Sequence, residues 1–264
     1  MTQHLDHLQH IRVTTRPEGI TDVVLDRAPG NALHETLIAE LDEVAGFLST
    51  PGATRVVLLS SAIDAFMVGA DLNMMDAGWS KVQELVRSFQ AAVTRWERIP
   101  RPTIAVLAGH ALGAGCELAL ACDFRLMSNE RARIGLPEVR RGLIAAGGGT
   151  QRMARTVGRA VALDLCLRGR MLTGGEAAAV GLVHEVCSPS ELTARAESLA
   201  QELAGLPPLT VSAIKRCILE GLDTDLVSGL AIEEDAMVAV AETEDAREGV
   251  ASFLEKREPR FIGR

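Results

Sequence analysis

Residues 109–123 read GHALGAGCELALACD and join a glycine-rich turn to a short apolar segment. The glycines at positions 109, 113 and 115 permit backbone conformations and close approaches that a Cβ atom would prevent. The segment that follows is a predicted helix, and it is apolar on every side except at Glu117. A helix that is apolar all round is normally buried all round. We therefore expect Glu117 to be a buried carboxylate near the positive end of the helix dipole.

Predicted strands and helices alternate on the N-terminal side of this stretch. Residues 11–15 and 20–26 are rich in β-branched residues and flank a Pro-Glu-Gly turn, which predicts a β-hairpin. Apolar residues at helical spacing predict a helix over residues 33–50. The apolar run 55–60 predicts a strand that is buried on both faces, and the apolar run 103–107 predicts another strand. The order strand, helix, strand predicts a parallel crossover connection.

Capping-box patterns indicate two further helix starts. Residues 80–83 have this pattern ahead of a predicted helix that includes Trp96, and residues 173–176 have it ahead of a short helix. Further strands are predicted at residues 124–127 and 182–187. The chain therefore mixes strands and helices up to about residue 187.

Only helices are predicted beyond residue 188. Ser188, Pro189 and Glu191 supply a cap, a proline at the first helical position and an acid in the first turn. Three or four helices are expected, near residues 189–205, 208–221, 224–241 and 243–256. This change divides the chain into an α/β core of residues 1–188 and a C-terminal helical subdomain of residues 189–264.

The composition narrows the classes of function. The formal net charge of -8 argues against a nucleic-acid partner, because such binding depends on Lys and Arg contacts to phosphates. No apolar run is long enough to span a membrane. The N-terminal residues have no pattern of a signal or transit peptide, and the five cysteines form no C-x-x-C pair. We therefore expect a cytoplasmic protein that binds neither nucleic acid nor membrane.

Most kinds of catalytic site lack their motifs in this chain. The glycine-rich turns do not complete a dinucleotide fingerprint or a P-loop, and no G-x-S-x-G motif is present. The histidines do not form a metal-ligand pattern, so no metal site is predicted. Two carboxylates remain. Glu117 has an alternative explanation as an acid that favours a helix start, and Glu138 has one as a surface ion pair with Arg140 or Arg141.

The segment IAVLAGHALGAGCELALACDF, residues 104–124, resembles the signature of the crotonase family, the enoyl-CoA hydratases and isomerases. The similarity runs essentially end to end. Further matching segments are RIGLPEVRRGL (133–143), GGGTQRMARTVG (147–158), AFMVGAD (65–71), RAPGNAL (27–33) and FLEKREPRF (253–261). The resemblance implies a crotonase-like spiral of ββα turns capped by C-terminal helices. It also implies a homotrimer or a hexamer of two trimers, and an acyl-CoA thioester substrate with no separate cofactor.

The resemblance also assigns the reacting groups. The backbone N–H groups of Ala70 and Ala114 match the oxyanion hole that binds the thioester oxygen. Glu117 matches the glutamate that activates water, and Glu138 matches the one that protonates the α-carbon. Two carboxyl groups that face one desolvated cavity are expected to have raised or separated pKa values, which suits acid-base catalysis near neutral pH.

Other positions match contacts to the substrate. The coenzyme-binding candidates are Arg27, Ala28, Asp71, Leu72, Asn73 and, across a subunit interface, Phe253 and Lys256. The candidates for the acyl pocket, for which core packing is an equal alternative, are Met67, Met74, Met75, Leu143 and Ile144. The sequence departs from the family pattern at Ala114 in the glycine triplet, at Asn73, where a lysine is common, at Ala145, where a proline is frequent, and by one extra residue between the glutamates.

Enoyl-CoA hydration is the function predicted from the signature together with both glutamates. One alternative is another reaction through the same enolate: isomerisation, dehydration of a 3-hydroxyacyl-CoA, or hydration of a ring-derived enoyl-CoA. A second alternative is a family member without turnover that binds CoA esters or RNA. Both glutamates argue against lost chemistry, and the acidic charge argues against RNA.

Overall fold

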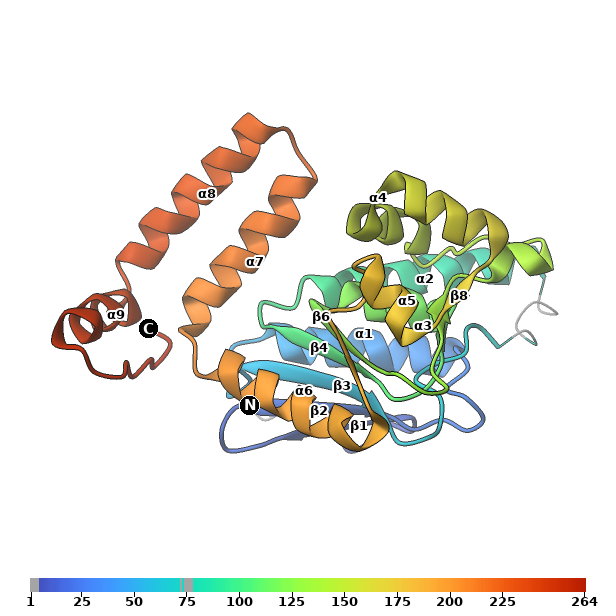
Figure 1. Ribbon diagram of the computed structural model, residues 1–264, viewed down its shortest axis with the longest axis horizontal. Helices are drawn as coiled ribbons and strands as arrows, with labels where there is room; N and C mark the ends of the chain where they lie inside the picture. Colours follow the sequence, from blue (N-terminus) through green and yellow to red (C-terminus); the bar gives the residue numbers. More distant parts are fainter. Residues whose placement is uncertain (1–4, 72, 74–77) are drawn as a thin grey trace.

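A twisted sheet of six strands forms the centre of the molecule (Figure 1), whose computed structural model describes residues 5–71, 73 and 78–264. The strands lie in the order β1-β2-β3-β4-β6-β9. Their bounds are β1 Ile11–Thr15, β2 Ile20–Leu25, β3 Val56–Ser61, β4 Thr103–Leu107, β6 Phe124–Ser128 and β9 Glu185–Cys187. β1 pairs with β2 antiparallel, and each later pair is parallel. The predicted hairpin and the parallel crossover are both confirmed.

The last strand of this sheet is shorter than the sequence predicts. Strand pairing is limited to residues 185–187, although the expectation covered residues 182–187. The amides of Leu182 and Val183 donate to the carbonyl of Ala177 instead, because the chain is still closing the turn after the preceding helix. That helix, α5 (Gly174–Ala179), starts with the predicted capping box at Thr173 and Glu176.

The first helices cover one face of the sheet. These are α1 (Glu35–Ser49), α2 (Trp79–Glu97) and α3 (Ala114–Ala121), and α4 (Gly149–Arg168) packs on the outer side of α3 (Figure 1). Val57 and Leu59 of β3 pack with Leu41 of α1 and with Trp96 in the main hydrophobic core. The predicted capping box at residues 80–83 is wrong, since α2 begins after Gly78, which puts Ser80 inside the helix.

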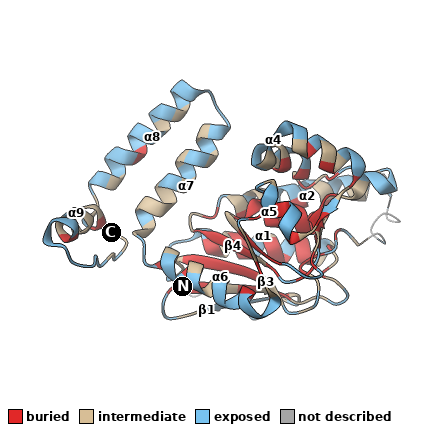
Figure 2. Cartoon of the chain, in the orientation of Figure 1, coloured by how far each residue is buried: buried red, intermediate tan, exposed pale blue. Residues whose placement is uncertain are grey.

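The opposite face of the sheet is covered by a helix from beyond residue 188. α6 (Pro189–Ala204) packs Leu192 and Ala196 against Val56 and Leu58 of β3. β3 is therefore buried on both faces, as predicted. The remaining helices α7 (Pro208–Leu222), α8 (Leu226–Ala241) and α9 (Glu244–Glu255) project away from the sheet and are largely exposed (Figures 1 and 2). Among the described residues, none of the helices combines the length and the apolar character that a membrane span requires.

A second, smaller sheet brings distant parts of the chain together. It consists of β5 (Ala111–Leu112), β7 (Ile134–Gly135) and β8 (Met171–Leu172), in the order β5-β7-β8. The amide of Gly113 donates to the carbonyl of Gly135 at 3.0 Å, which extends the pairing of β5 with β7. The start of α3 therefore lies beside the segment that leads to the 3-10 helix η2 (Glu138–Arg141).

Candidate active site

One cavity of about 290 Å³ contains all four positions that the sequence assigns to the reaction. Ala70, Ala114, Glu117 and Glu138 line it together. They come from the loop after β3, from the first turn of α3 and from η2. The predicted gathering of these residues is therefore present in the structure, while their catalytic roles stay predictions.

The backbone N–H groups of Ala70 and Ala114 are available to a ligand. Ala114 is the first residue of α3, where helix geometry leaves the amide without an intrahelical acceptor. Beside Ala70, the amide of Leu33 donates to Gly69 and the amide of Asp71 donates to Leu33, both at 2.8 Å. These two hydrogen bonds fix residues 69–71 beside Leu33 and do not use the amide of Ala70. Within the described residues, neither alanine amide donates a hydrogen bond.

Glu117 is a buried carboxylate with backbone donors. Its exposed fraction is 3%, and its Oε1 accepts a hydrogen bond from the amide of Gly149 at 2.8 Å. Burial raises the pKa of Glu117 to about 7, and the charge of Glu138 adds to this, while the amides of Gly149 and Gly147 and the cation of Arg152 oppose it. Glu117 can therefore gain or lose a proton near neutral pH, as predicted.

Glu138 is the less satisfied of the two carboxyl groups. Its Oε2 is buried and has no hydrogen-bond partner among the described residues. Burial raises the pKa of Glu138, against the opposing effects of its own backbone amide and of Arg141. The alternative interpretation as a solvated surface ion pair is therefore wrong. A buried polar atom without a partner is uncommon and indicates a place for a ligand or water.

Two glycines of the signature allow the start of α3 to lie close to Glu138 and to the backbone of Met67. Gly113 has a φ of +54°, and a Cβ atom there would lie 2.7 Å from Oε1 of Glu138. At Gly115 a Cβ atom would lie 2.2 Å from the carbonyl oxygen of Met67. A side chain at position 113 would displace Glu138, which lines the cavity, and one at position 115 would separate α3 from the backbone at Met67.

The coenzyme-binding candidates on the first loops lie beside one another. Arg27 pairs with Asp71 at 3.2 Å, and the Asp71 carboxylate also accepts hydrogen bonds from the backbone and side chain of Asn73. The backbone amide of Asn73 has the largest effect in lowering the pKa of Asp71, and the guanidinium of Arg27 lowers it further. Ala28 is exposed next to Arg27. Leu72 lies outside the described residues.

The remaining coenzyme candidates lie far from the cavity of their own chain. Phe253 is in the last turn of α9 and is 81% exposed, and Lys256 follows as the exposed C-cap of that helix. Neither residue lines the cavity. The prediction that they contact the coenzyme of a neighbouring subunit needs a second copy and stays a prediction.

The cavity has an apolar wall that the sequence predicted only in part. Leu143 and Ile144 line it as predicted, but Met67 is fully buried in the core, and Met74 and Met75 lie outside the described residues. The wall that sequence reasoning missed consists of Leu33, Ile38, Val82, Leu85, Val86 and Phe89. Their helical spacing was visible, but core-facing and cavity-facing residues of a helix share the same period.

The chain is similar to known proteins over nearly its whole length. Residues 15–264 match the model of a family described as enoyl-CoA hydratase/isomerase. The chain is 38% identical to enoyl-CoA hydratase domain-containing protein 2, mitochondrial, of Mus musculus, covering 100% of this chain and 91% of that protein. It is 36% identical to methylglutaconyl-CoA hydratase, mitochondrial, of Rattus norvegicus, covering 98% and 84%.

A solved structure has the same fold over nearly its whole length. The crystal structure of an enoyl-CoA hydratase from Bacillus anthracis superposes with a TM-score of 0.92 at 35% identity, covering 97% of this chain and 100% of that one. The shared fold agrees with the sequence match over residues 15–264. The chain therefore belongs to the enoyl-CoA hydratase/isomerase family, the crotonases.

Proposed function

We propose that this protein is an enoyl-CoA hydratase, which adds water across the 2,3-double bond of a trans-2-enoyl-CoA. The observation that carries the proposal is the pair of carboxyl groups, Glu117 and Glu138, in one cavity with two free backbone amides. Hydration needs one group to accept a proton from water and another to deliver one to carbon. Burial raises the pKa of Glu117 to about 7, which supports proton exchange near neutral pH, and burial also raises the pKa of Glu138.

The reaction can be written with these groups alone. The thioester oxygen accepts hydrogen bonds from the amides of Ala70 and Ala114, and such preorganised donors stabilise an enolate by about 3 kcal/mol each. Glu117 takes one proton from water while the hydroxyl oxygen bonds to the β-carbon. The electron pair of the double bond moves into the enolate, and the α-carbon then takes a proton from Glu138, which starts protonated while Glu117 starts ionised. A proton passes from Glu117 back to Glu138 after the product forms, which restores the starting state. Coenzyme A is part of the substrate, and no other cofactor is needed.

The assembly belongs to the same proposal. The projecting helices expose large apolar side chains at Leu209, Ile214, Ile218, Leu222, Leu226, Val227, Leu230, Met237 and Val238. Exposed apolar patches of this extent are typical of protein interfaces. We propose a homotrimer, or two trimers in a hexamer, in which Phe253 and Lys256 reach the coenzyme of a neighbouring subunit. The five free cysteines suit our proposal of a cytoplasmic location.

Hydration is tested by mixing the protein with trans-2-enoyl-CoA esters of several chain lengths. The absorbance of the conjugated thioester is expected to fall. Glu117→Gln and Glu138→Gln should each slow this by at least about a hundredfold and still bind the ester. Glu130→Gln, an exposed glutamate outside the cavity, is the matched control and should behave as the wild type. A folded wild-type protein that hydrates none of these esters would refute the proposal.

A further inference from the structure

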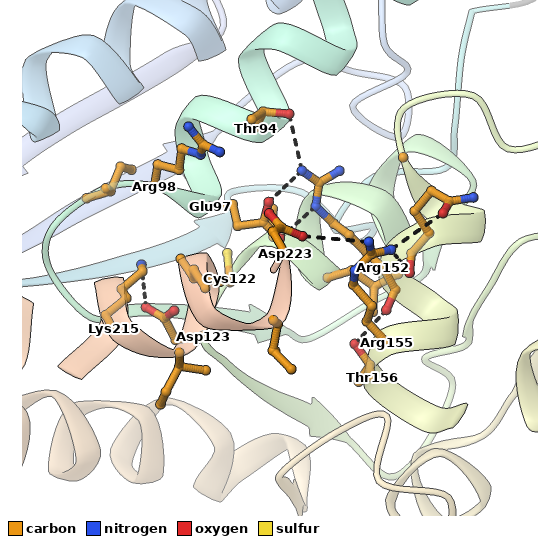
Figure 3. Close-up of a pocket in the computed structure, with 18 of the residues that line it drawn as sticks. Thr94, Glu97, Arg98, Cys122, Asp123, Arg152, Arg155, Thr156, Lys215 and Asp223 are labelled. Atoms are coloured by element: carbon orange, nitrogen blue, oxygen red, sulfur yellow. Dashed lines mark hydrogen bonds and ion pairs between the residues drawn. The ribbon is translucent and has the colours of Figure 1, made fainter. Parts of the chain in front are cut away.

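An arginine lies behind the turn that holds Glu117, on the side away from the substrate cavity. Arg152 is in the first turn of α4, and its side chain is 12% exposed. Its Nε and Nη2 donate to the two carboxylate oxygens of Glu97 at 2.9 and 2.7 Å (Figure 3). Nη2 also donates to Oγ1 of Thr94 at 3.3 Å, and Nη1 donates to the carbonyl of Gly147 at 3.2 Å. Arg152 is thus held by α2 and bonded to the backbone before α4.

The backbone between Arg152 and Glu117, residues 147–149, is here called the glycine turn. Its amide at Gly149 donates to Oε1 of Glu117 at 2.8 Å, and the amide of Gly147 also lowers the pKa of the Glu117 carboxyl. A Cβ atom at Gly147 would lie 2.6 Å from Oε2 of Glu117, and one at Gly148 would lie 2.1 Å from Nη1 of Arg152. The turn therefore separates the carboxylate from the guanidinium by the thickness of the backbone alone.

We propose that Arg152 is a positioning residue for the reaction. By binding the carbonyl of Gly147 and resting against Gly148, it holds the glycine turn in place, and the amides of this turn orient Glu117 toward water. Glu97 and Thr94 hold the guanidinium in turn. This inference rests on the proposed hydratase function, in which Glu117 must accept a proton.

The positive charge of Arg152 also supports Glu117 as a base, because a nearby cation favours the ionised carboxylate. Among the described residues, two charged groups shift the pKa of the Glu117 carboxyl: Glu138 from η2 and Arg152 from α4. The thiol of Cys116, the preceding residue of α3, has a pKa that burial raises. Arg152 is the cation that opposes the rise in the pKa of Glu117. Since Arg152 does not line the substrate cavity, it is expected to affect the proton transfer and not the binding of substrate.

The first test compares Arg152→Gln with Arg152→Lys. Arg152→Gln is expected to lower kcat by about ten- to a hundredfold with KM within about twofold, since a displaced base costs rate and not binding. In the plot of kcat against pH, the acidic limb should shift to higher pH, because the pKa of Glu117 rises. Arg152→Lys keeps the charge but cannot bond Glu97 and Gly147 as a planar fork. It should restore most of the pH profile and only part of kcat.

Arg155→Gln is the matched control. Arg155 lies one turn further along α4, is 51% exposed and pairs with Asp223 at 3.6 Å (Figure 3). Its replacement should leave kcat and the pH profile unchanged. A folded Arg152→Gln protein with wild-type kcat and a wild-type pH profile would overturn the inference.

A second measurement does not depend on activity. Infrared or carbon-13 titration of the glutamate carboxyl groups, assigned by the signal lost in Glu117→Gln, should show a higher pKa for Glu117 in Arg152→Gln. If that variant does not fold, Glu97→Gln takes its place: it keeps the cation, so kcat should fall while the pKa of Glu117 does not rise. An unchanged kcat in Glu97→Gln would count against the inference. A wild type without hydratase activity overturns the proposed function, whereas the titration still decides the role of Arg152.

Discussion

Glu117 and Glu138 face the same cavity but differ in their hydrogen bonds. Glu117 accepts a hydrogen bond from the amide of Gly149, a bond that favours its ionised form, whereas Oε2 of Glu138 has no partner among the described residues. A carboxyl group with donors ionises more readily than one without them. Deeper burial opposes this effect and raises the pKa of Glu117 to about 7. The hydrogen bonds alone therefore do not assign the two roles, and Glu117 as the base for water with Glu138 as the acid for the α-carbon stays the assignment that the family resemblance implies.

The buried charge of Glu117 is expected to destabilise the protein as the pH rises. Because the pKa of Glu117 is raised from 4.5 to about 7 in the folded state, the folded state binds this proton more tightly than the unfolded state does. The stabilisation by the proton is complete below pH 4.5 and is lost as the pH rises toward 7, about 3 kcal/mol in all. Glutamine does not titrate, so Glu117→Gln should gain stability relative to wild type over this range.

Urea denaturation at about pH 5 and about pH 8 measures this difference. The difference in the free energy of unfolding between Glu117→Gln and wild type should be larger at about pH 8 than at about pH 5. The same difference for Glu130→Gln should not change with pH. If the free energies of unfolding of wild type and Glu117→Gln change equally between the two pH values, then Glu117 does not have the raised pKa described above.

The sequence predicts one of these glutamates better than the other. The burial of Glu117 follows from a helix that is apolar on all other sides. The environment of Glu138 does not follow from its neighbours, because Arg140 and Arg141 suggest a surface ion pair. The sequence does not predict the contacts of Arg152, because its partner Glu97 is 55 residues away in the chain and an arginine near a helix start is usually solvated. These environments depend on tertiary contacts.

At the scale of elements, the small sheet and the turn at Gly113 decide whether Glu138 reaches the cavity. β5, β7 and β8 have two residues each, which is too short for any hydrophobic period to be visible in the sequence. Capping boxes show the same limit. The pattern at Thr173 starts a helix, but the similar one at Ser80 lies inside a helix that starts earlier, after Gly78.

Gly113→Ala tests the geometry of this turn. Alanine at a φ of +54° is expected to cost about 1–3 kcal/mol of stability. The loss of hydratase activity should exceed what the lower stability explains, because the added Cβ would lie 2.7 Å from Oε1 of Glu138 and displace it. Denaturation curves and initial hydration rates measure the two effects.

Gly175→Ala is the control for that substitution. Gly175 lies in α5, and a Cβ atom there would meet nothing within 4 Å. Alanine should therefore leave activity unchanged and stability equal or slightly higher. If Gly113→Ala behaves in the same way as Gly175→Ala, the turn does not position Glu138.

At the scale of the whole molecule, the chain has two parts with different surroundings. The sheet is covered on both faces, by α1 on one side and by α6 on the other, whereas α7, α8 and α9 project with apolar side chains exposed (Figure 2). The sequence predicted the change to helices after residue 188. It could not indicate that α6 packs on the sheet, because the apolar stripes of α6 and α7 look alike.

The proposed trimer depends on the apolar surface of the projecting helices. Leu226 and Leu230 are exposed and lie one turn apart on α8. Replacing both with aspartate should shift the protein toward monomers, measured by size-exclusion chromatography with light scattering, and weaken CoA-ester binding. Asp235→Asn, on the opposite side of α8, is the control and should leave the mass unchanged. A wild-type protein that is monomeric at micromolar concentration would contradict the proposed assembly.

Mass spectrometry of the product formed in ¹⁸O-labelled water tests the hydratase mechanism most directly. From trans-2-enoyl-CoA we predict a 3-hydroxyacyl-CoA with one ¹⁸O atom on the β-carbon. The rate of labelling should fall to about a hundredth or less in both Glu117→Gln and Glu138→Gln, and stay at the wild-type level in Glu130→Gln. An unlabelled isomer as the product, or labelling that persists at the wild-type rate without either glutamate, would contradict the assignment of these two carboxyl groups to hydration.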